Sequence, residues 1–280
     1  MREDDFKELR IWVKSLWKGE TIPEELQPRI EHLLTPHVIE REVMQLIHEW
    51  LDFLRVSRKP GRIIAPPGTG KTVTCDIYRL LNKPVKVPGR RDIVPVLYLQ
   101  APQDCSVKEL LILILELLKV DTSGEVATLR RRVRETLKVS QVKMIIIDEA
   151  NLLNLKTFSE IARIYDLNKI SIILVGTAEL DTLIKVNEFI YDRFKECYSF
   201  DILTPKEFKE IVEICENEIV KLPVPSNLTQ PDILNKLYQK TDGKMRHLDW
   251  ILRKAGVFAL KKGLNHIDKE TLDEVLLRFG

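Results

Sequence analysis

The chain has 280 residues, of which 44% are hydrophobic and 31% charged, and its formal net charge is +2. This length predicts about two domains, and the composition is that of a globular protein rather than a disordered or fibrous one. The longest apolar run, Leu110–Leu115, is far shorter than the ~18 residues of a membrane span, and Met1–Arg10 lacks the apolar block of a signal peptide, so we expect a cytoplasmic protein with no membrane partner.

Residues 1–60 are predicted to form a helical N-terminal extension. Between residues 43 and 54, apolar side chains recur at intervals of three, four and seven, so they form one buried stripe of a helix. Pro23, Pro28 and Pro36 divide the rest of the extension into short helices, because proline breaks a helix interior.

Residues 61–203 alternate between strand and helix patterns. Five short apolar segments predict strands at residues 62–65, 94–99, 144–147, 170–175 and, more weakly, 197–200. Helices are expected between them, near residues 70–82, 106–119, 126–139 and 155–167. Because parallel strands are joined by helical crossovers, this alternation predicts an α/β domain whose parallel five-stranded sheet is flanked by helices.

The strand pattern ends at Thr204. Residues 205–221, 230–241, 245–262 and 268–279 instead predict four amphipathic helices. Thr204 and Glu207 have the spacing of a capping box, with Pro205 at the first helical position. Residues 204–280 are therefore predicted to form a small all-helical C-terminal domain.

A glycine-rich loop follows the first predicted strand. Residues 65–72 read Ala-Pro-Pro-Gly-Thr-Gly-Lys-Thr and lead into a helix, an arrangement that wraps backbone N–H groups around phosphates. Lys71 is expected to reach the β- and γ-phosphates of ATP, and the Thr72 hydroxyl to bind Mg²⁺. The nucleotide-binding residues predicted here are Pro67, Gly68, Thr69, Gly70, Lys71, Thr72 and Val73. Ala65 stands where the pattern has glycine, which costs about 1 kcal/mol if its φ is positive and little if it is extended.

Two carboxylates end a strongly apolar strand. Residues 144–147 are followed by Asp148 and Glu149, which places Asp148 at the carboxyl edge of the sheet, where ligands bind. Asp148 is expected to hold Mg²⁺, and Glu149 to polarise the water that attacks the γ-phosphate. Alone, a strand that ends in Asp-Glu also fits an ordinary helix start. Together with the phosphate loop, it predicts an ATP hydrolase.

Three further polar residues are candidates for the same site. Thr177 follows the fourth strand and is assigned a water- or phosphate-sensing role, with helix capping as the alternative. Arg193 precedes the last strand and is expected to act on the nucleotide of a neighbouring subunit, unless it forms a surface ion pair. Arg246 starts a helix of the C-terminal domain and is expected to fold over the phosphates, unless it is a solvated helix residue.

Taken together, the phosphate loop, Asp148-Glu149, Thr177, Arg193 and Gly243-x-x-Arg246 resemble an AAA+ P-loop ATPase with a helical lid. Further stretches narrow the resemblance to the TnsC/TniB transposition regulators. These are Gly70-Lys71-Thr72-Val73 with Cys75-Asp76 and Tyr78-Arg79, residues 146–150, residues 174–177 with Leu180-Asp181, Arg193-Phe194, residues 221–228 and residues 246–249. The compact length is most similar to the short TnsC proteins of CRISPR-associated transposons.

This resemblance implies a mechanism and a set of partners. ATP-bound subunits would form a homo-oligomer, assembling head to tail as a ring or helical filament around duplex DNA without reading its sequence. The assembly would mark a target site, recruit the transposase and contact a target-selection protein of the TniQ type; a CRISPR effector stays open as a further partner. ATP hydrolysis would dismantle the assembly. The resemblance also places the protein in a bacterial cytoplasm.

The residues that would contact DNA are less evident. The resemblance points to the two ends of the helix near residues 106–119, where Lys108, Lys119 and Thr122 are the candidates. Two basic clusters compete, and each also fits a solvated face: Arg79, Lys83, Lys86, Arg90 and Arg91, and Arg130, Arg131, Arg132 and Arg134. With a net charge of only +2, attraction to DNA must come from such patches or from repetition in an oligomer.

Two other functions stay open on this pattern. One is a loader that remodels another DNA-processing protein, such as a replicative helicase. The other is a nucleotide-gated interaction module that binds ATP but hydrolyses it negligibly. The phosphate loop fits all three functions. A threading motor usually carries an aromatic pore loop after the second strand, and residues 101–107 contain no aromatic side chain, which argues against threading.

Overall fold

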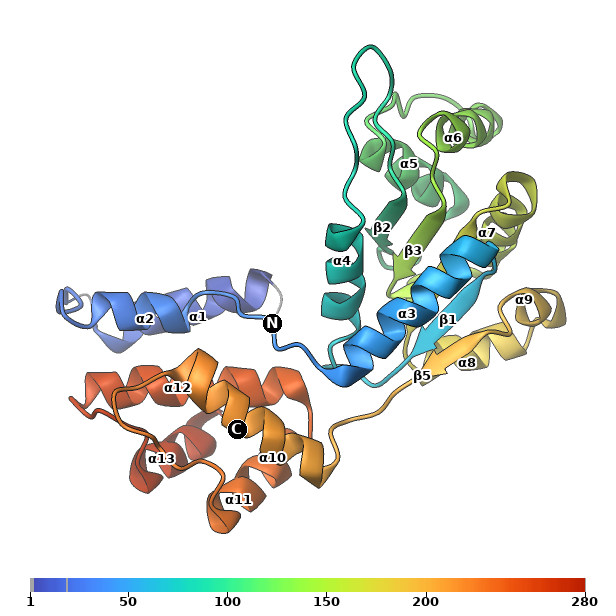
Figure 1. The fold of residues 1–280 in the computed structure, drawn as a ribbon. Coiled ribbons are helices and arrows are strands. Elements are labelled where there is room, and N and C mark those ends of the chain that lie inside the picture. Colours follow the sequence, from blue (N-terminus) through green and yellow to red (C-terminus); the bar gives the residue numbers. More distant parts are fainter. Residues whose placement is uncertain (1–2, 19, 280) are drawn as a thin grey trace. The chain divides into compact units, whose positions relative to one another are not determined.

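The computed structural model describes residues 3–18 and 20–279 (Figure 1). Its contacts divide the chain into two compact units. The helical unit comprises residues 1–40, 68–70 and 202–280, and the sheet unit comprises residues 41–67 and 71–201. Residues near both ends of the chain therefore belong to one unit. The domain boundaries expected at residues 60 and 203 stay a prediction.

The sheet unit is built on five strands. They are β1 (Gly61–Ile64), β2 (Val96–Gln100), β3 (Met144–Asp148), β4 (Ser171–Gly176) and β5 (Cys197–Ser199). Their order is β2-β3-β4-β1-β5, and every neighbouring pair is parallel. The predicted parallel five-stranded sheet is confirmed. Since β3, β4 and β1 are neighbours, their carboxyl ends meet at one edge of the sheet.

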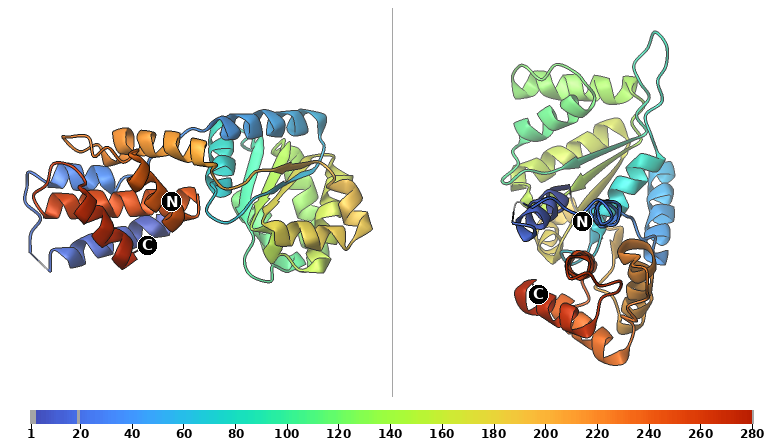
Figure 2. Two further views of the ribbon diagram at one scale, coloured as in Figure 1. Left: turned by 90° about the horizontal axis from the view of Figure 1, so that it is seen from below. Right: turned by 90° about the vertical axis from the view of Figure 1, so that its left-hand side faces the viewer.

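Helices cover both faces of this sheet (Figure 2). One face carries α3 (Glu42–Ser57) and α4 (Lys71–Leu81), and the other carries α5 (Val107–Leu117), α6 (Val126–Val139), α7 (Leu155–Asn168), α8 (Ala178–Lys185) and α9 (Glu188–Arg193). Successive strand side chains point to opposite faces. Accordingly, Ile146 packs with α3 and α4 while Ile145 and Ile147 pack with the other set. A strand buried on both sides needs an unbroken apolar run, which explains residues 144–147.

The sequence patterns did not predict α8 and α9, two short α-helices of the sheet unit. They span eight and six residues, so each shows barely two turns of helical periodicity. Local signals start them all the same: Asn187 caps α9 by accepting a hydrogen bond from the N–H of Ile190. The buried Arg62 of β1 anchors α8 through an ion pair of 3.0 Å with Asp181.

The helical unit combines N-terminal and C-terminal helices. These are α1 (Glu3–Leu16), α2 (Gln27–Leu33), α10 (Pro205–Ile214) with its π-helical continuation η2 (Cys215–Val220), α11 (Pro231–Thr241), α12 (Met245–Lys261) and α13 (Lys269–Phe279). The four helices expected after residue 204 are confirmed, as is the capping box of Thr204 and Glu207. Leu9 and Val13 of α1 pack with Val257 and Leu260 of α12. This apolar contact explains why residues 1–40 belong to this unit.

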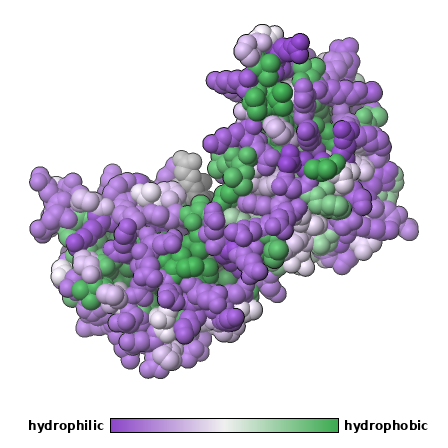
Figure 3. All heavy atoms as spheres, viewed as in Figure 1, coloured by the Kyte–Doolittle hydropathy of each residue, from purple (hydrophilic) through white to green (hydrophobic). Residues whose placement is uncertain are grey.

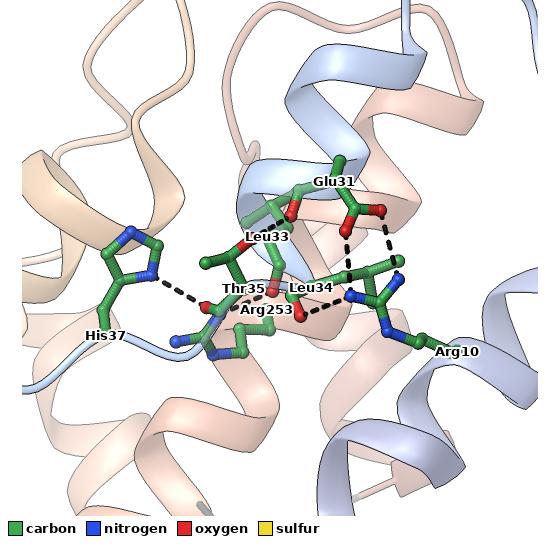
Figure 4. A network of polar contacts seen from close by, with 7 residues as sticks. All are labelled: Arg10, Glu31, Leu33, Leu34, Thr35, His37 and Arg253. Atoms are coloured by element: carbon green, nitrogen blue, oxygen red, sulfur yellow. Dashed lines mark hydrogen bonds and ion pairs between the residues drawn. The ribbon is translucent and has the colours of Figure 1, made fainter. Parts of the chain in front are cut away.

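Arg253 ties α2 to α12 (Figure 4). Its side chain is fully buried, and its Nε donates to Asp249 Oδ1 at 2.7 Å. Its Nη1 donates to the carbonyl oxygens of Leu33 at 2.5 Å and Thr35 at 2.9 Å. Carbonyls at a helix C-terminus lack helical hydrogen-bond partners and carry negative partial charge. The buried guanidinium at the end of α2 supplies both the hydrogen-bond donors and the positive charge that these carbonyls lack.

Replacing Arg253 with methionine is expected to lower the free energy of unfolding by about 3–5 kcal/mol. The variant keeps the side-chain volume but leaves the buried Asp249 carboxylate without its counter-charge, and breaking a buried pair costs about that much. Denaturant titration followed by tryptophan fluorescence measures it, because Trp12, Trp17 and Trp250 all lie in this unit.

Arg10→Met is the matched control for Arg253→Met. Arg10 pairs with Glu31 in the same region (Figure 4), but the two side chains are 44% and 60% exposed, so the loss should stay within about 1 kcal/mol. Equal losses in the two variants would contradict the structural role of the buried pair.

The surface is mainly polar. Hydrophilic residues cover most of the face drawn in Figure 3. Single apolar side chains such as Val56 and Leu277 are exposed, as on most globular proteins. Among the described residues, no helix is both long and apolar enough to cross a membrane.

Candidate nucleotide site

The glycine-rich loop leaves β1 at the carboxyl edge of the sheet. Gly68 and Gly70 have φ angles of 80° and 104°, a region that other residues rarely adopt, so the two glycines are needed for this turn. Ala65 is buried, its φ is not positive, and its N–H donates to the Gly176 carbonyl at 3.1 Å. Alanine in place of glycine therefore carries no backbone strain here, because the position continues the ladder between β1 and β4.

Lys71 is the first residue of α4. Its ammonium donates to the carbonyl oxygens of Ala65 at 2.6 Å and Pro66 at 2.9 Å. The charge is thus held at the mouth of the loop, close to the helix N-terminus that follows. A cation and a helix N-terminus at one place favour an anionic ligand.

Asp148 is the centre of a hydrogen-bond cluster. Its side chain is 1% exposed at the end of β3. Its Oδ2 accepts hydrogen bonds from Thr72 Oγ1 at 2.7 Å and Tyr98 Oη at 2.8 Å, and its Oδ1 accepts from the Glu149 N–H at 2.8 Å. The structure therefore brings together Thr72 and Asp148, the two residues predicted to bind Mg²⁺.

Tyr98 is a site residue that the sequence reasoning missed. Burial and the Asp148 carboxylate raise the pKa of its phenol well above the ordinary value, so it stays a protonated donor. The available signal was a phenol on β2, two residues before the strand's carboxyl end. Strand order could not be deduced from that alone, so the contact between β2 and β3 was not foreseen.

Glu149 has an unusual backbone conformation. Its φ of 53° and ψ of 37° lie in the left-handed region, at the start of the 3₁₀ turn η1 (Ala150–Leu152). Ten described non-glycine residues have a positive φ, and Arg58, Lys169 and Asp242 are C-caps of helices, whereas Glu149 directly follows a strand. The conformation re-aims the chain directly after β3, so that the Glu149 side chain does not continue the strand's alternation.

Asn151 and Gly176 fit closely beside this turn. A Cβ on Gly176 would lie 3.0 Å from Asn151 Oδ1 and 2.8 Å from Leu180 Cδ2, so only glycine fits without displacement. Asn151 Oδ1 is buried and has no hydrogen-bond partner among the described residues. Buried polar atoms are usually paired, so the Asn151 amide is, besides Tyr98, a further candidate residue of this site.

Thr177 lies directly after β4, at the N-cap position of α8. Its backbone is extended, as a capping residue requires, but its side chain accepts no capping hydrogen bond. Ordinary side-chain capping, the alternative to a sensing role, is thus not what this hydroxyl does. The sensing role stays a prediction.

Arg193 ends α9 and is held by its own chain. Its Nη2 lies 3.0 Å from Asp166 Oδ2, its Nη1 donates to the Phe189 carbonyl at 3.0 Å, and its guanidinium stacks 3.6 Å from the Phe189 ring centre. Within a single chain, Arg193 therefore forms an ion pair, which is the alternative to a role in a neighbouring subunit. The action of Arg193 on a neighbour's nucleotide stays a prediction.

Arg246 lies in the helical unit, in the first turn of α12. Its Nε is 3.8 Å from the Asp5 carboxylate of α1, a long ion pair between partly exposed side chains. Such a pair contributes little energy and is easily exchanged for another anion. Its predicted contact with phosphates stays a prediction.

The predicted DNA-contacting residues do not form one cluster. Lys108 lies in the first turn of α5 and Lys119 just after its end, so the helix separates their Cα atoms by roughly 15 Å. Thr122 lies next to Asp121, whose pKa is lowered by hydrogen bonds from Ser123, so a charged carboxylate borders this candidate. The DNA-binding roles of Lys108, Lys119 and Thr122 stay a prediction.

The competing basic clusters are partly neutralised. Arg79 pairs with Asp76 at 2.7 Å, and Arg132 pairs with Asp121 at 2.9 Å. Arg130 forms a two-pronged pair with the buried carboxylate of Glu160, with N–O distances of 2.7–3.0 Å. The four arginines of residues 130–134 therefore do not act as one uniform patch.

Comparisons with known proteins agree with this geometry. A family model described as "Bacterial TniB protein" matches residues 29–201. None of the curated proteins matches the sequence. One similar solved structure is Cdc6p from Pyrobaculum aerophilum, with 19% sequence identity and a TM-score of 0.67; the match covers 88% of this chain and 69% of that one. Another is the Aeropyrum pernix ORC1 protein in complex with DNA, with 17% identity and a TM-score of 0.65; the match covers 88% of this chain and 68% of that one.

A third similar structure is the RuvB Holliday junction branch migration motor from Thermotoga maritima (14% identity, TM-score 0.53, 85% of this chain and 69% of that one). At these identities the likeness shows the fold alone. The fold is that of an AAA+ P-loop nucleoside triphosphatase, as predicted.

Proposed function

Because the chain belongs to the bacterial TniB protein family, we propose that it is a Mg²⁺-dependent ATPase that regulates DNA transposition. The observation that carries the proposal is the 2.7 Å contact between Thr72 and Asp148, which joins the phosphate loop to the end of β3. It sets a hydroxyl, a buried carboxylate and the Lys71 ammonium at one edge of the sheet. ATP hydrolysis at this edge is the activity that these groups support best.

The side chains present fit a magnesium–ATP complex. Mg²⁺ is commonly held by one or two carboxylates together with substrate phosphates, so Thr72 and Asp148 are a sufficient protein contribution. The described residues contain no group of three or more His, Cys, Asp or Glu side chains arranged for a metal. When bound, the metal neutralises phosphate charge during phosphoryl transfer.

Glu149 is the residue that we assign to proton removal from the attacking water. Its carboxylate follows the Mg²⁺-binding Asp148 by one residue, and its left-handed backbone turns it out of the strand. The Thr177 hydroxyl, which is not used in capping, lies at the end of the next strand and would orient the same water. General-base action of this kind contributes about 10²–10⁴ to a rate.

In the proposed assembly, Arg193 of one subunit completes the nucleotide site of its neighbour. On its own chain this arginine is held by Asp166, so it would have to exchange that partner for phosphate oxygens of a neighbour. Both pairings are charge-assisted, and the exchange would link nucleotide state to subunit contact. We therefore propose head-to-tail assembly in which ATP lies between subunits.

The finer proposal follows the short TnsC proteins of CRISPR-associated transposons. In it, subunits assemble as a filament on duplex DNA, mark the target, and recruit a transposase and a TniQ-type target selector. Family membership supports the link to transposition. Contacts to the DNA backbone rather than to bases would make binding independent of sequence and steeply dependent on salt.

Negative-stain electron microscopy with duplex DNA tests this proposal. We expect filaments whose length follows that of the duplex when ATP or a slowly hydrolysed analogue is present, and no filaments with ADP, because only a γ-phosphate completes the contact between subunits. The matched control is the protein incubated with ATP but without DNA. Closed rings of constant size, formed equally with and without DNA, would contradict it.

A further inference from the structure

A hollow of about 270 Å³ lies between α6 and α7 in the sheet unit. It is formed by residues that the nucleotide site does not use. Its wall includes three exposed arginines: Arg131 and Arg134 on α6 and Arg163 on α7. Helical spacing brings Arg131 and Arg134 to one side, since residues three apart are neighbours on a helix surface.

In the described part of the chain, these three arginines have no acidic partner. Among the described residues, no ion pair or hydrogen bond joins Arg131, Arg134 or Arg163 to a carboxylate, in contrast to Arg130 and Arg132 on the same helix. The carboxylate that lines the hollow, Glu160, is 5% exposed and fully engaged by Arg130. The hollow therefore presents a net positive wall that an anionic ligand would neutralise.

The floor of the hollow is apolar. Val133 and Ile164 are buried beneath it, and Leu167 lines it while remaining 45% exposed. An apolar floor of this kind gains free energy when another apolar group displaces its water. Asn168 also lines the hollow, and its Oδ1 is buried without a hydrogen-bond partner among the described residues, so it is an acceptor in need of an N–H donor.

We propose that this hollow binds an acidic protein segment that carries a hydrophobic side chain. Carboxylates of the segment pair with Arg131, Arg134 and Arg163, since guanidinium groups match carboxylates in two-pronged geometry. The apolar side chain covers Leu167, and a backbone N–H satisfies Asn168. A DNA phosphate backbone fits less well, because phosphodiesters offer neither an N–H donor nor an apolar group. The proposal goes beyond the function proposed above and does not depend on nucleotide.

Fluorescence anisotropy with defined peptides tests the proposal. The probe is a fluorescein-labelled peptide in which Leu-Trp is flanked on both sides by Asp and Glu, titrated with the full chain in the absence of nucleotide and DNA. The comparison peptide has Ser-Ser in place of Leu-Trp. We expect measurable binding of the first peptide and at least about tenfold weaker binding of the second, since its apolar contact is missing.

Two double variants locate the binding. Arg131→Glu with Arg163→Glu should weaken binding of the acidic apolar peptide at least about tenfold. Lys138→Glu with Lys156→Glu changes the net charge equally on the same two helices, at exposed positions outside the hollow, and should change it less than about threefold. Leu167→Ser tests the floor without altering charge and should also weaken binding. Circular dichroism melting checks that all variants fold.

Three results would overturn the proposal. The first is that the acidic apolar peptide fails to bind. The second is that the two double variants weaken binding of this peptide equally, which would indicate attraction by net charge alone. The third is that a fluorescein-labelled DNA duplex loses affinity in Arg131→Glu with Arg163→Glu while the two peptides bind alike. The last result would assign the hollow to nucleic acid instead.

Discussion

Replacing Glu149 with glutamine is expected to slow ATP hydrolysis at least about 100-fold while ATP binding changes less than about threefold. Glutamine has nearly the same shape, so the turn that begins at Glu149 and the contacts of Asp148 should survive. Its amide, however, accepts no proton from water, and loss of a general base costs about 10²–10⁴ in rate. Phosphate release and binding of a fluorescent ATP analogue measure the two quantities separately.

The same substitution is expected to trap assemblies, because disassembly in the proposed mechanism follows hydrolysis. The matched control is Glu179→Gln, which removes an exposed carboxylate from the first turn of α8, just beyond the end of β4. It should leave phosphate release within about twofold. If Glu149→Gln released phosphate at the wild-type rate, Glu149 would not be the catalytic carboxylate, and the assignment would pass to another acid at this edge.

The sheet could be predicted from the sequence because burial of a strand on both faces requires a run of consecutive apolar residues, which is visible in a short stretch of sequence. Residues 144–147 and 172–175 are uninterrupted apolar runs, as strands buried on both faces require, and the described strands β3 and β4 lie there. The nucleotide loop was equally readable, since Gly68, Gly70 and Lys71 stand at fixed spacing between a strand and a helix.

Contacts between distant segments could not be predicted from the sequence. Leu33 and Arg253 are joined by a hydrogen bond across 220 positions, and no local pattern distinguishes a helix arginine that will be buried from one that stays in water. Tyr98 meets Asp148 only because β2 and β3 are neighbours. The Arg193–Asp166 pair depends in the same way on the packing of α9 against α7, and α9 itself was too short to show a helical period.

Replacing Lys71 with alanine is expected to weaken ATP binding about 100-fold or more, and with it to abolish ATP-dependent assembly on DNA. The substitution removes the cation at the loop mouth and also the two hydrogen bonds to Ala65 and Pro66. Truncating one partner of a close charge pair costs about 2–5 kcal/mol, and 2.8 kcal/mol corresponds to about 100-fold in affinity. Calorimetric titration with ATP and Mg²⁺ measures the binding loss.

A second variant separates the two effects of that substitution. Lys71→Gln removes the charge but keeps an N–H donor for the loop carbonyls, so equal losses of ATP affinity in Lys71→Gln and Lys71→Ala would assign the effect to charge. Lys143→Ala is the control, because Lys143 is an exposed lysine at the opposite, amino edge of the sheet, just before β3. Wild-type ATP affinity in Lys71→Gln would show that the ammonium charge is not needed. Assembly would then depend on the shape of the loop, and the expectation that the Lys71 charge is needed for ATP binding and ATP-dependent assembly would be wrong.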